Sequence, residues 1–219
     1  MRPEVRIRRR SVTRSAFLSD EIKCVAKRFA AKASLIRLAG EARETDIKSL
    51  SESGKLAQYR VLHFATHGLL SGDVERMAQR QGEPALVLTP PDQPVDADDD
   101  GLLMASEVAA LKLNADWVVM SACNTAAGDK IGAQALSGLA RAFFYAGGRA
   151  LLVSHWPVYS DAAVRLTTTA FAELDRNPKA GRAEALQNAM IALIDDRSQA
   201  DNAHPAVWAP FVVVGEGGR

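Results

Sequence analysis

Short apolar runs that alternate with helical patterns are the sequence feature that most restricts the fold of this chain. Four such runs read as strands, at residues 59–68, 115–122, 149–157 and 209–215. They are solidly apolar, as strands are when both faces of a parallel sheet are covered by helices. A weaker strand candidate lies at residues 34–40. We therefore predict one α/β domain.

Helical patterns fill most of the sequence between these runs. Helices are expected at residues 18–32, 41–57, 102–111, 132–148, 162–174 and 180–196. The clearest is 132–148, which carries one apolar stripe and ends at two glycines. Asp161 is a candidate N-cap for the helix that follows it. Residues 71–101 hold most of the helix and strand breakers, and we expect a long loop there, interrupted by one apolar run.

Composition excludes several classes of function. The chain has 219 residues and a net charge of +1, which is too small to steer the whole protein onto nucleic acid or membrane. Two cysteines and four histidines make neither a disulfide framework nor a metal site, so we expect free thiols, a cytoplasmic location and no cofactor. No glycine-rich phosphate loop follows a strand. The acidic run "DADDD" lacks the spacing of a calcium loop and is expected to be solvated.

The first 18 residues differ from the rest of the chain. The stretch "MRPEVRIRRRSVTR" holds six arginines and a single acid, Glu4. A transit peptide and a nucleic-acid patch are the alternatives, but neither an apolar face nor interleaved aromatic residues accompany the charges. We interpret residues 1–18 as a solvated basic tail and residues 19–219 as the domain.

Reactive side chains follow two of the predicted strands. His67 lies where the first strand runs into a turn at Gly68, in "HFATHG", and Cys123 follows the second strand in "MSACNT", 56 residues later. Sites in α/β proteins form where parallel strands end, so helical crossovers could bring both side chains to one edge of the sheet. An adjacent imidazole activates a thiol by favouring its thiolate. The backbone N–H groups of Gly68 and Cys123 could together bind an oxyanion.

Other residues compete for these roles. His63 lies between two apolar residues, and we expect it to pack or to form a hydrogen bond. Cys24 lies on a predicted amphipathic helix and is expected to be structural. His155 and His204 follow Cys123 in the chain, so "SHWPV" offers an alternative base.

Five segments resemble the CHAT domain, a bacterial relative of caspases and separase. They are "YRVLHFATHG", "GLLMASEVAALKL", "ADWVVMSACNTAAGD", "GLARAFFYAGGRALLVSHWPV" and "HPAVWAPFVVVG", in the family's order over roughly residues 20–215. The resemblance implies a caspase-like three-layer α/β/α sandwich with a mostly parallel central sheet. CHAT domains often have additional N-terminal sheet, so three interpretations stay open for this chain: a fragment, a minimal protein, or one half of a split system.

The resemblance also implies a cysteine endopeptidase. His67 would be the base, Cys123 the nucleophile, and Gly68 and Cys123 the donors of the oxyanion hole. The loop "SHWPVYSD" would select the substrate side chain at P1, with Trp156 and Asp161 as candidate contacts and Asp161 suited to a basic residue. Ser121 is a further candidate contact, or a residue that shapes the cysteine loop.

Partners follow from the same resemblance. We expect a protein or peptide substrate, a regulatory partner such as a repeat-containing module, and a role in bacterial signalling or defence, with neither nucleic acid nor membrane as a partner. The family's loop is closer to "SLWPVDD", so His155 and Ser160 depart from it. These departures leave open a catalytically silent CHAT scaffold, and the same dyad could also transfer an acyl group to a non-peptide acceptor.

Overall fold

A computed structural model describes residues 21–27, 32, 35–78, 82–91, 99–121, 138–156, 158–177 and 179–218 of the chain. The strands are β1 (Val61–Phe64), β2 (His67–Leu69), β3 (Ala85–Val87), β4 (Leu102–Met104), β5 (Trp117–Met120), β6 (Ala150–Ser154) and β7 (Phe211–Gly215). The helices are α2 (Glu44–Glu52), α3 (Ser71–Ala78), α4 (Ala105–Ala110), α5 (Gly138–Ala146), α6 (Ser160–Arg176), α7 (Arg182–Asp195) and α8 (Pro205–Trp208), and residues 21–27 are also helical.

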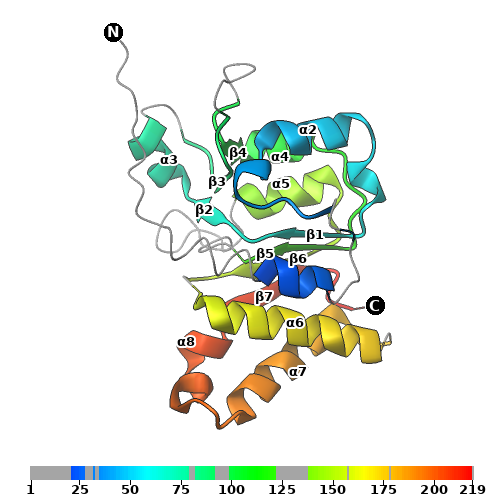
Figure 1. Ribbon diagram of the computed structural model, residues 1–219, viewed down its shortest axis with the longest axis vertical. Coiled ribbons are helices and arrows are strands. Elements are labelled where there is room, and N and C mark those ends of the chain that lie inside the picture. The colour runs from blue at the N-terminus through cyan, green and yellow to red at the C-terminus, as the bar shows by residue number, and fades with distance from the viewer. Residues whose placement is uncertain are drawn as a thin grey trace.

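The central sheet has four strands in the order β1-β5-β6-β7. Strands β1, β5 and β6 run parallel, and β7 pairs antiparallel with β6. The order places β5 beside β1 although five elements separate them in the chain (Figure 1). The predicted α/β class with a mostly parallel sheet is therefore confirmed.

Helices cover both faces of this sheet, as Figure 1 shows, with α2, α4 and α5 above and α6 and α7 below. The side chains of β5 alternate between the two layers. Val118 and Met120 pack in the upper core, whereas Trp117 and Val119 pack in the lower core with Val25 of the helical residues 21–27. Each of these β5 side chains is at most 2% exposed. Burial on both faces explains why the strand runs are solidly apolar, and the arrangement is the three-layer sandwich that the sequence predicts.

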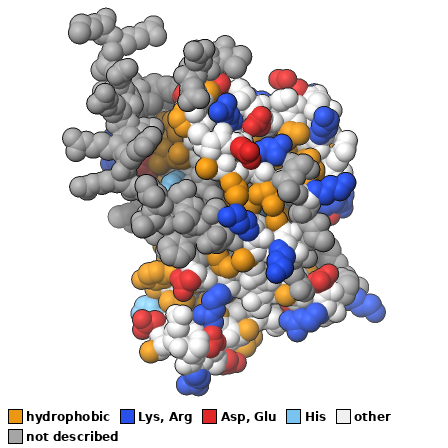
Figure 2. Space-filling view, viewed as in Figure 1, with side chains coloured by type: hydrophobic (Ala, Val, Ile, Leu, Met, Phe, Trp, Pro, Cys, Tyr) orange, Lys and Arg blue, Asp and Glu red, His pale blue; other side chains and the backbone are white. Residues whose placement is uncertain are grey.

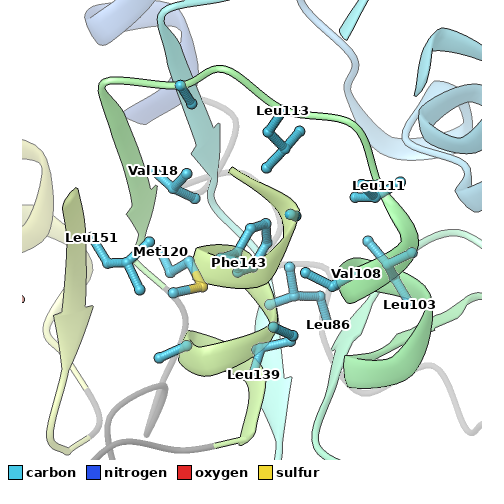
Figure 3. Close-up of a cluster of buried hydrophobic side chains, with 14 of the residues drawn as sticks. Leu86, Leu103, Val108, Leu111, Leu113, Val118, Met120, Leu139, Phe143 and Leu151 are labelled. Carbon is cyan, nitrogen blue, oxygen red and sulfur yellow. The ribbon is translucent and has the colours of Figure 1, made fainter. Parts of the chain in front are cut away.

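Phe143 of α5 lies in the centre of the upper core (Figure 3). Its ring is fully buried, and Val118 and Leu151 of the central sheet lie on one side of it. Leu86 of β3 and Leu103 of β4 belong to the same cluster. The upper core therefore joins the central sheet to a second, smaller sheet.

This second sheet is antiparallel, in the order β2-β3-β4, and the sequence did not predict it. Residues 59–68 are not one strand, because β1 ends at Phe64 and the chain starts β2 at His67. The side chain of Thr66 stabilises the change of direction by donating from Oγ1 to the carbonyl oxygen of Val87. A break of two residues within an apolar run leaves almost no trace in the hydrophobic pattern.

Several local predictions are corrected in the same region. Residues 71–101 are not one long loop, since they contain α3 and β3. Residues 102–111 begin as strand β4 before α4, and the described residues 35–40 contain no strand. Ala39 adopts a positive φ of 46° there and starts a 3-10 turn, Ala39–Glu41. Asp161 lies in the first turn of α6 and is not its cap, because the N-cap residue is Tyr159.

Charged side chains of both signs are interspersed over the face of the molecule seen in Figure 2, in keeping with the net charge of +1. Across the described ranges, no helix combines the length and the apolar character that crossing a membrane requires.

A buried carboxyl group lies where α2 meets the second sheet. Glu44 is 1% exposed, and its Oε1 lies 2.6 Å from Lys48 Nζ, which is also 2.7 Å from Glu107 Oε1. Burial is the main cause that raises the pKa of Glu44 to about 7, and the nearby carboxylate of Glu107 adds to it, while the hydrogen bond from Lys48 works against it. Burial also opposes the charge of Lys48, but its hydrogen bonds to Glu107 and Glu44 outweigh burial and raise the pKa of Lys48.

We predict that Glu44→Gln flattens the pH dependence of stability between about pH 4.5 and 7. In this range the folded protein keeps a proton that the unfolded chain has lost, so the free energy of unfolding of the wild type falls as the pH rises. The loss should be on the order of 2 kcal/mol across the range. Urea unfolding at several pH values measures it, with the exposed Glu52→Gln at the other end of α2 as the control. Parallel stability curves for Glu44→Gln and wild type would contradict the assignment.

Candidate functional site

The three parallel strands of the central sheet, β1, β5 and β6, have their carboxyl ends on one side of the sheet. We refer to this side as the edge. Residue Phe64, the last of β1, pairs with Met120, the last of β5, and β6 ends on the far side of β5 at Ser154. The segments singled out from the sequence all follow these strand ends. His67 comes three residues after Phe64, and Cys123 comes three residues after Met120. Cys123 itself lies outside the described residues.

His67 is the first residue of β2 and is half-buried. It pairs with Val87 of β3, and the neighbouring residue of β3, Leu86, is fully buried in the upper core. The second sheet therefore holds the backbone of His67 against the same core that supports the central sheet. The backbone of His67 therefore has a fixed position relative to the carboxyl ends of β1 and β5.

The register of β2 also determines the direction of the Gly68 N–H group. Leu88 N donates to Gly101 O at 2.7 Å, so the even-numbered residues of β3 form hydrogen bonds to β4. In an antiparallel ladder the backbone N–H and C=O groups of the odd-numbered residues of β3 then point toward β2. Gly68 lies opposite Leu86, an even-numbered residue. The Gly68 N–H group consequently points away from β3 and takes no part in that ladder.

A buried polar cluster lies at the same edge, on the lower face of the sheet. His63 Nε2 is 2.9 Å from Glu21 Oε1 and 3.3 Å from Ser121 Oγ. Glu21 is 1% and Ser121 6% exposed, and the side chain of His63 is 8% exposed. His63 was expected either to pack or to form a hydrogen bond, and the structure shows hydrogen-bond contacts to Glu21 and Ser121. We refer to Glu21, His63 and Ser121 as the edge cluster.

Glu21 is a site residue that the sequence reasoning missed. It precedes Val25 by four residues, so both lie on the inward face of the helical residues 21–27. A carboxylate on the apolar face of an amphipathic helix is a signal that could have found it, because buried carboxylates need partners.

The loop after β6 carries the remaining candidates. Trp156 is 37% exposed, and its ring centroid lies 6.2 Å from that of His155, which is exposed. Asp161, in the first turn of α6, is exposed as well. These side chains follow the end of β6 and so begin at the same edge as His67. His67, Gly68, Ser121 and Trp156 thus follow the ends of β1, β5 and β6, and Asp161 lies in the first turn of α6.

The other cysteine, Cys24, lies in the helical residues 21–27. Cys24 is exposed, so the expectation that it is structural is not supported, and any thiol chemistry must be measured without it. Within the described ranges, no group of three or more His, Cys, Asp or Glu side chains is arranged to hold a metal ion.

The fold, a mostly parallel sheet between two layers of helices, is consistent with a caspase-like α/β protein. The family model of the CHAT domain matches residues 4–216. The chain therefore belongs to the CHAT domain family, a caspase-like family related to cysteine peptidases.

One curated relative also matches. Tetratricopeptide repeat protein 28 of Mus musculus is 32% identical over 114 residues, which are 52% of this chain and 4% of that protein. The chain thus spans a very small part of the length of this relative.

We predict that Thr66→Val lowers the free energy of unfolding by about 1 kcal/mol, because the hydroxyl that bonds to Val87 O is lost while the shape is kept. Thr66→Ser retains the hydroxyl and serves as the matched control. Urea unfolding of both variants measures the difference. Equal stability of Thr66→Val and Thr66→Ser would show that this bond does not hold the start of β2.

Proposed function

We propose that this CHAT protein is a cysteine endopeptidase in which His67 and Cys123 form the catalytic dyad. The observation that carries the proposal is the register of β1 on β5. Phe64 and Met120 pair at the edge, and the two candidate residues follow them at equal sequence distance. Adjacent strand ends favour contact between the side chains that come next. Membership of a family related to cysteine peptidases supports the same chemistry.

The reaction would proceed in two steps. The thiolate of Cys123 attacks the carbonyl carbon of the scissile peptide bond and forms a tetrahedral intermediate. His67 then gives its proton to the departing amine, the C–N bond breaks, and an acyl-enzyme is left. Water, deprotonated by His67, attacks the thioester, and the carboxylic acid product leaves as the thiol forms again.

The oxyanion of each intermediate would be bound by backbone donors. Gly68 is suited to this role because its N–H group points away from β3. A side chain at that position would crowd the approach of the substrate, which glycine avoids. The second donor in this proposal is the N–H group of Cys123.

Substrate selection is proposed for the loop after β6. Trp156 offers an exposed aromatic surface there, and Asp161 offers a carboxylate that forms no ion pair within the described residues. A basic P1 residue would therefore be preferred. Ser121 is buried against His63, which supports its role in shaping the cysteine segment over direct contact with substrate.

We predict that Cys123→Ala abolishes cleavage of a peptide library and that His67→Ala reduces kcat/KM by at least about 100-fold, since a positioned base contributes rate factors of this size. His155→Ala is the matched control, because His155 is exposed after the neighbouring strand and is the rival base. It should keep activity within a few-fold of wild type. Retained cleavage in His67→Ala together with loss in His155→Ala would reassign the base.

We also predict that Asp161→Asn lowers kcat/KM for substrates with Arg or Lys at P1 by about tenfold and leaves substrates with uncharged P1 residues unchanged, as expected for one lost charge pair. The control is Asp175→Asn, an exposed carboxylate in the last turns of the same helix. The same loss for charged and uncharged P1 residues would remove Asp161 from the specificity pocket.

A catalytically silent binding module is the second candidate, and the altered loop favours it. His155 and Ser160 stand where the family pattern differs. In that case a peptidyl electrophile should fail to label Cys123 in a Cys24→Ala background, and no peptide should be cleaved. Rapid labelling that depends on His67 would count against the silent module.

The biological setting is proposed from the family. A regulatory partner with repeat modules is consistent with the mouse relative, which is named as a tetratricopeptide repeat protein. We place the activity in the bacterial cytoplasm, in signalling or defence. Fractionation of the source cells and substrate profiling with and without neighbouring gene products test this setting, and recovery outside the cytoplasm would contradict it.

A further inference from the structure

We propose that the edge cluster, Glu21, His63 and Ser121, is a positioning device that fixes the carboxyl ends of β1 and β5 relative to each other. The inference deepens the proposed function and rests on it, because these two strand ends lead to His67 and Cys123. Its structural part, the fixing of the strand ends, can be measured whether or not the protein cleaves peptides.

The cluster connects three separate segments near the carboxyl ends of β1 and β5. His63 is the last but one residue of β1 and pairs with Val119, and Ser121 follows β5 directly. Side chains two residues apart on a strand share a face, so His63 and Ser121 are diagonal neighbours on the lower face. Glu21 reaches them from the helical residues 21–27, which pack against that face. The backbone supplies a further link, as Ser121 N donates to Phe64 O at 3.2 Å.

The geometry differs from a second active site. In a Ser-His-acid relay, the acid and the hydroxyl occupy opposite nitrogens of the imidazole. Here Glu21 Oε1 and Ser121 Oγ both lie against Nε2, and Nδ1 is buried with no hydrogen-bond partner among the residues that the structure describes. Ser121 therefore cannot be activated by His63 in the way a relay requires. The contacts orient the ring and hold the two strands.

Stability alone gives little reason for such a cluster. Burying a carboxylate and an imidazole is costly, and apolar residues of similar size often serve a core equally well or better. On the same face, Val61 and Trp117 are apolar and lie further from the strand ends than His63 and Ser121, and the apolar Val119 lies beside His63. Polar side chains occur where the strands end, next to the segments that carry the proposed dyad. Directional hydrogen bonds fix relative position more closely than apolar packing does, which is what a dyad drawn from two strands requires.

The test compares three variants in the Cys24→Ala background. The double variant Glu21→Leu/His63→Leu replaces both partners of the shorter bond by apolar groups, a change that is often neutral for stability. Ser121→Ala removes only one oxygen atom. It is expected to fold and therefore tests the proposal even if the double variant does not fold. Glu21→Gln is the matched control, because its Oε1 can still accept from Nε2 of His63.

Two measurements are made on each variant that keeps the wild-type unfolding midpoint. Amide hydrogen exchange should become at least fivefold faster at Ser121 N in the double variant and in Ser121→Ala, and stay unchanged at Trp117 N, which donates to Arg60 O at the opposite end of β5. The kcat for a cleaved peptide should fall at least about tenfold with KM within twofold, because positioning acts on the chemical step. Glu21→Gln should resemble the wild type in both.

The outcomes separate the two proposals. Faster exchange at Ser121 in a protein that cleaves no peptide upholds the fixing of the strand ends and rejects the peptidase. If the wild type is active and its folded variants keep both the exchange rate at Ser121 and the kcat, the positioning role is overturned. Equal loss of kcat in Glu21→Gln and in the double variant overturns the hydrogen-bond basis of the cluster.

Discussion

The parallel pairing of β1 with β5 is the constraint on which the rest of the structure depends. Phe64 and Met120 end the two strands in register. The chain that leaves each strand therefore starts from the same edge of the sheet, and whatever follows is brought near its counterpart. A shift of the register by one residue would move the side chains of β5 between the two cores and separate the two strand ends. Burial on both faces makes such a shift costly, since each face has its own apolar set.

Two further elements hold this edge from opposite sides. Above the sheet, the β2-β3-β4 sheet fixes the backbone at His67 and is itself fixed by Leu86 in the core around Phe143. Below the sheet, Glu21 contacts His63 where β1 ends. The edge is thus supported by apolar packing on one side and by directed polar contacts on the other. This division suits a site that must be both firmly placed and open to a substrate.

The sequence predicted the parts of the fold that depend on long periodic patterns. Solid apolar runs indicated the strands of the central sheet, and the stripe on α5 indicated its helix, because burial selects these residues directly. The second sheet was missed because each of its strands is only three residues long. Pairing between short strands depends on partners far away in the chain, such as Gly68 and Leu86, which no local pattern contains. Glu21 did carry a local signal, a carboxylate on the apolar face of a helix, but its partner His63 lies far away in the chain.

His67 and Gly68 follow the end of β1 and belong to the short strand β2, which the sequence did not predict. The central claim is that the imidazole of His67 acts on the thiol of Cys123. The rate of Cys123 alkylation by iodoacetamide at neutral pH tests this claim most directly, in Cys24→Ala protein with and without His67. His67→Ala should slow the reaction by about tenfold or more, because the thiolate loses the imidazole that favours it. Equal rates in the two proteins would show that His67 does not act on Cys123.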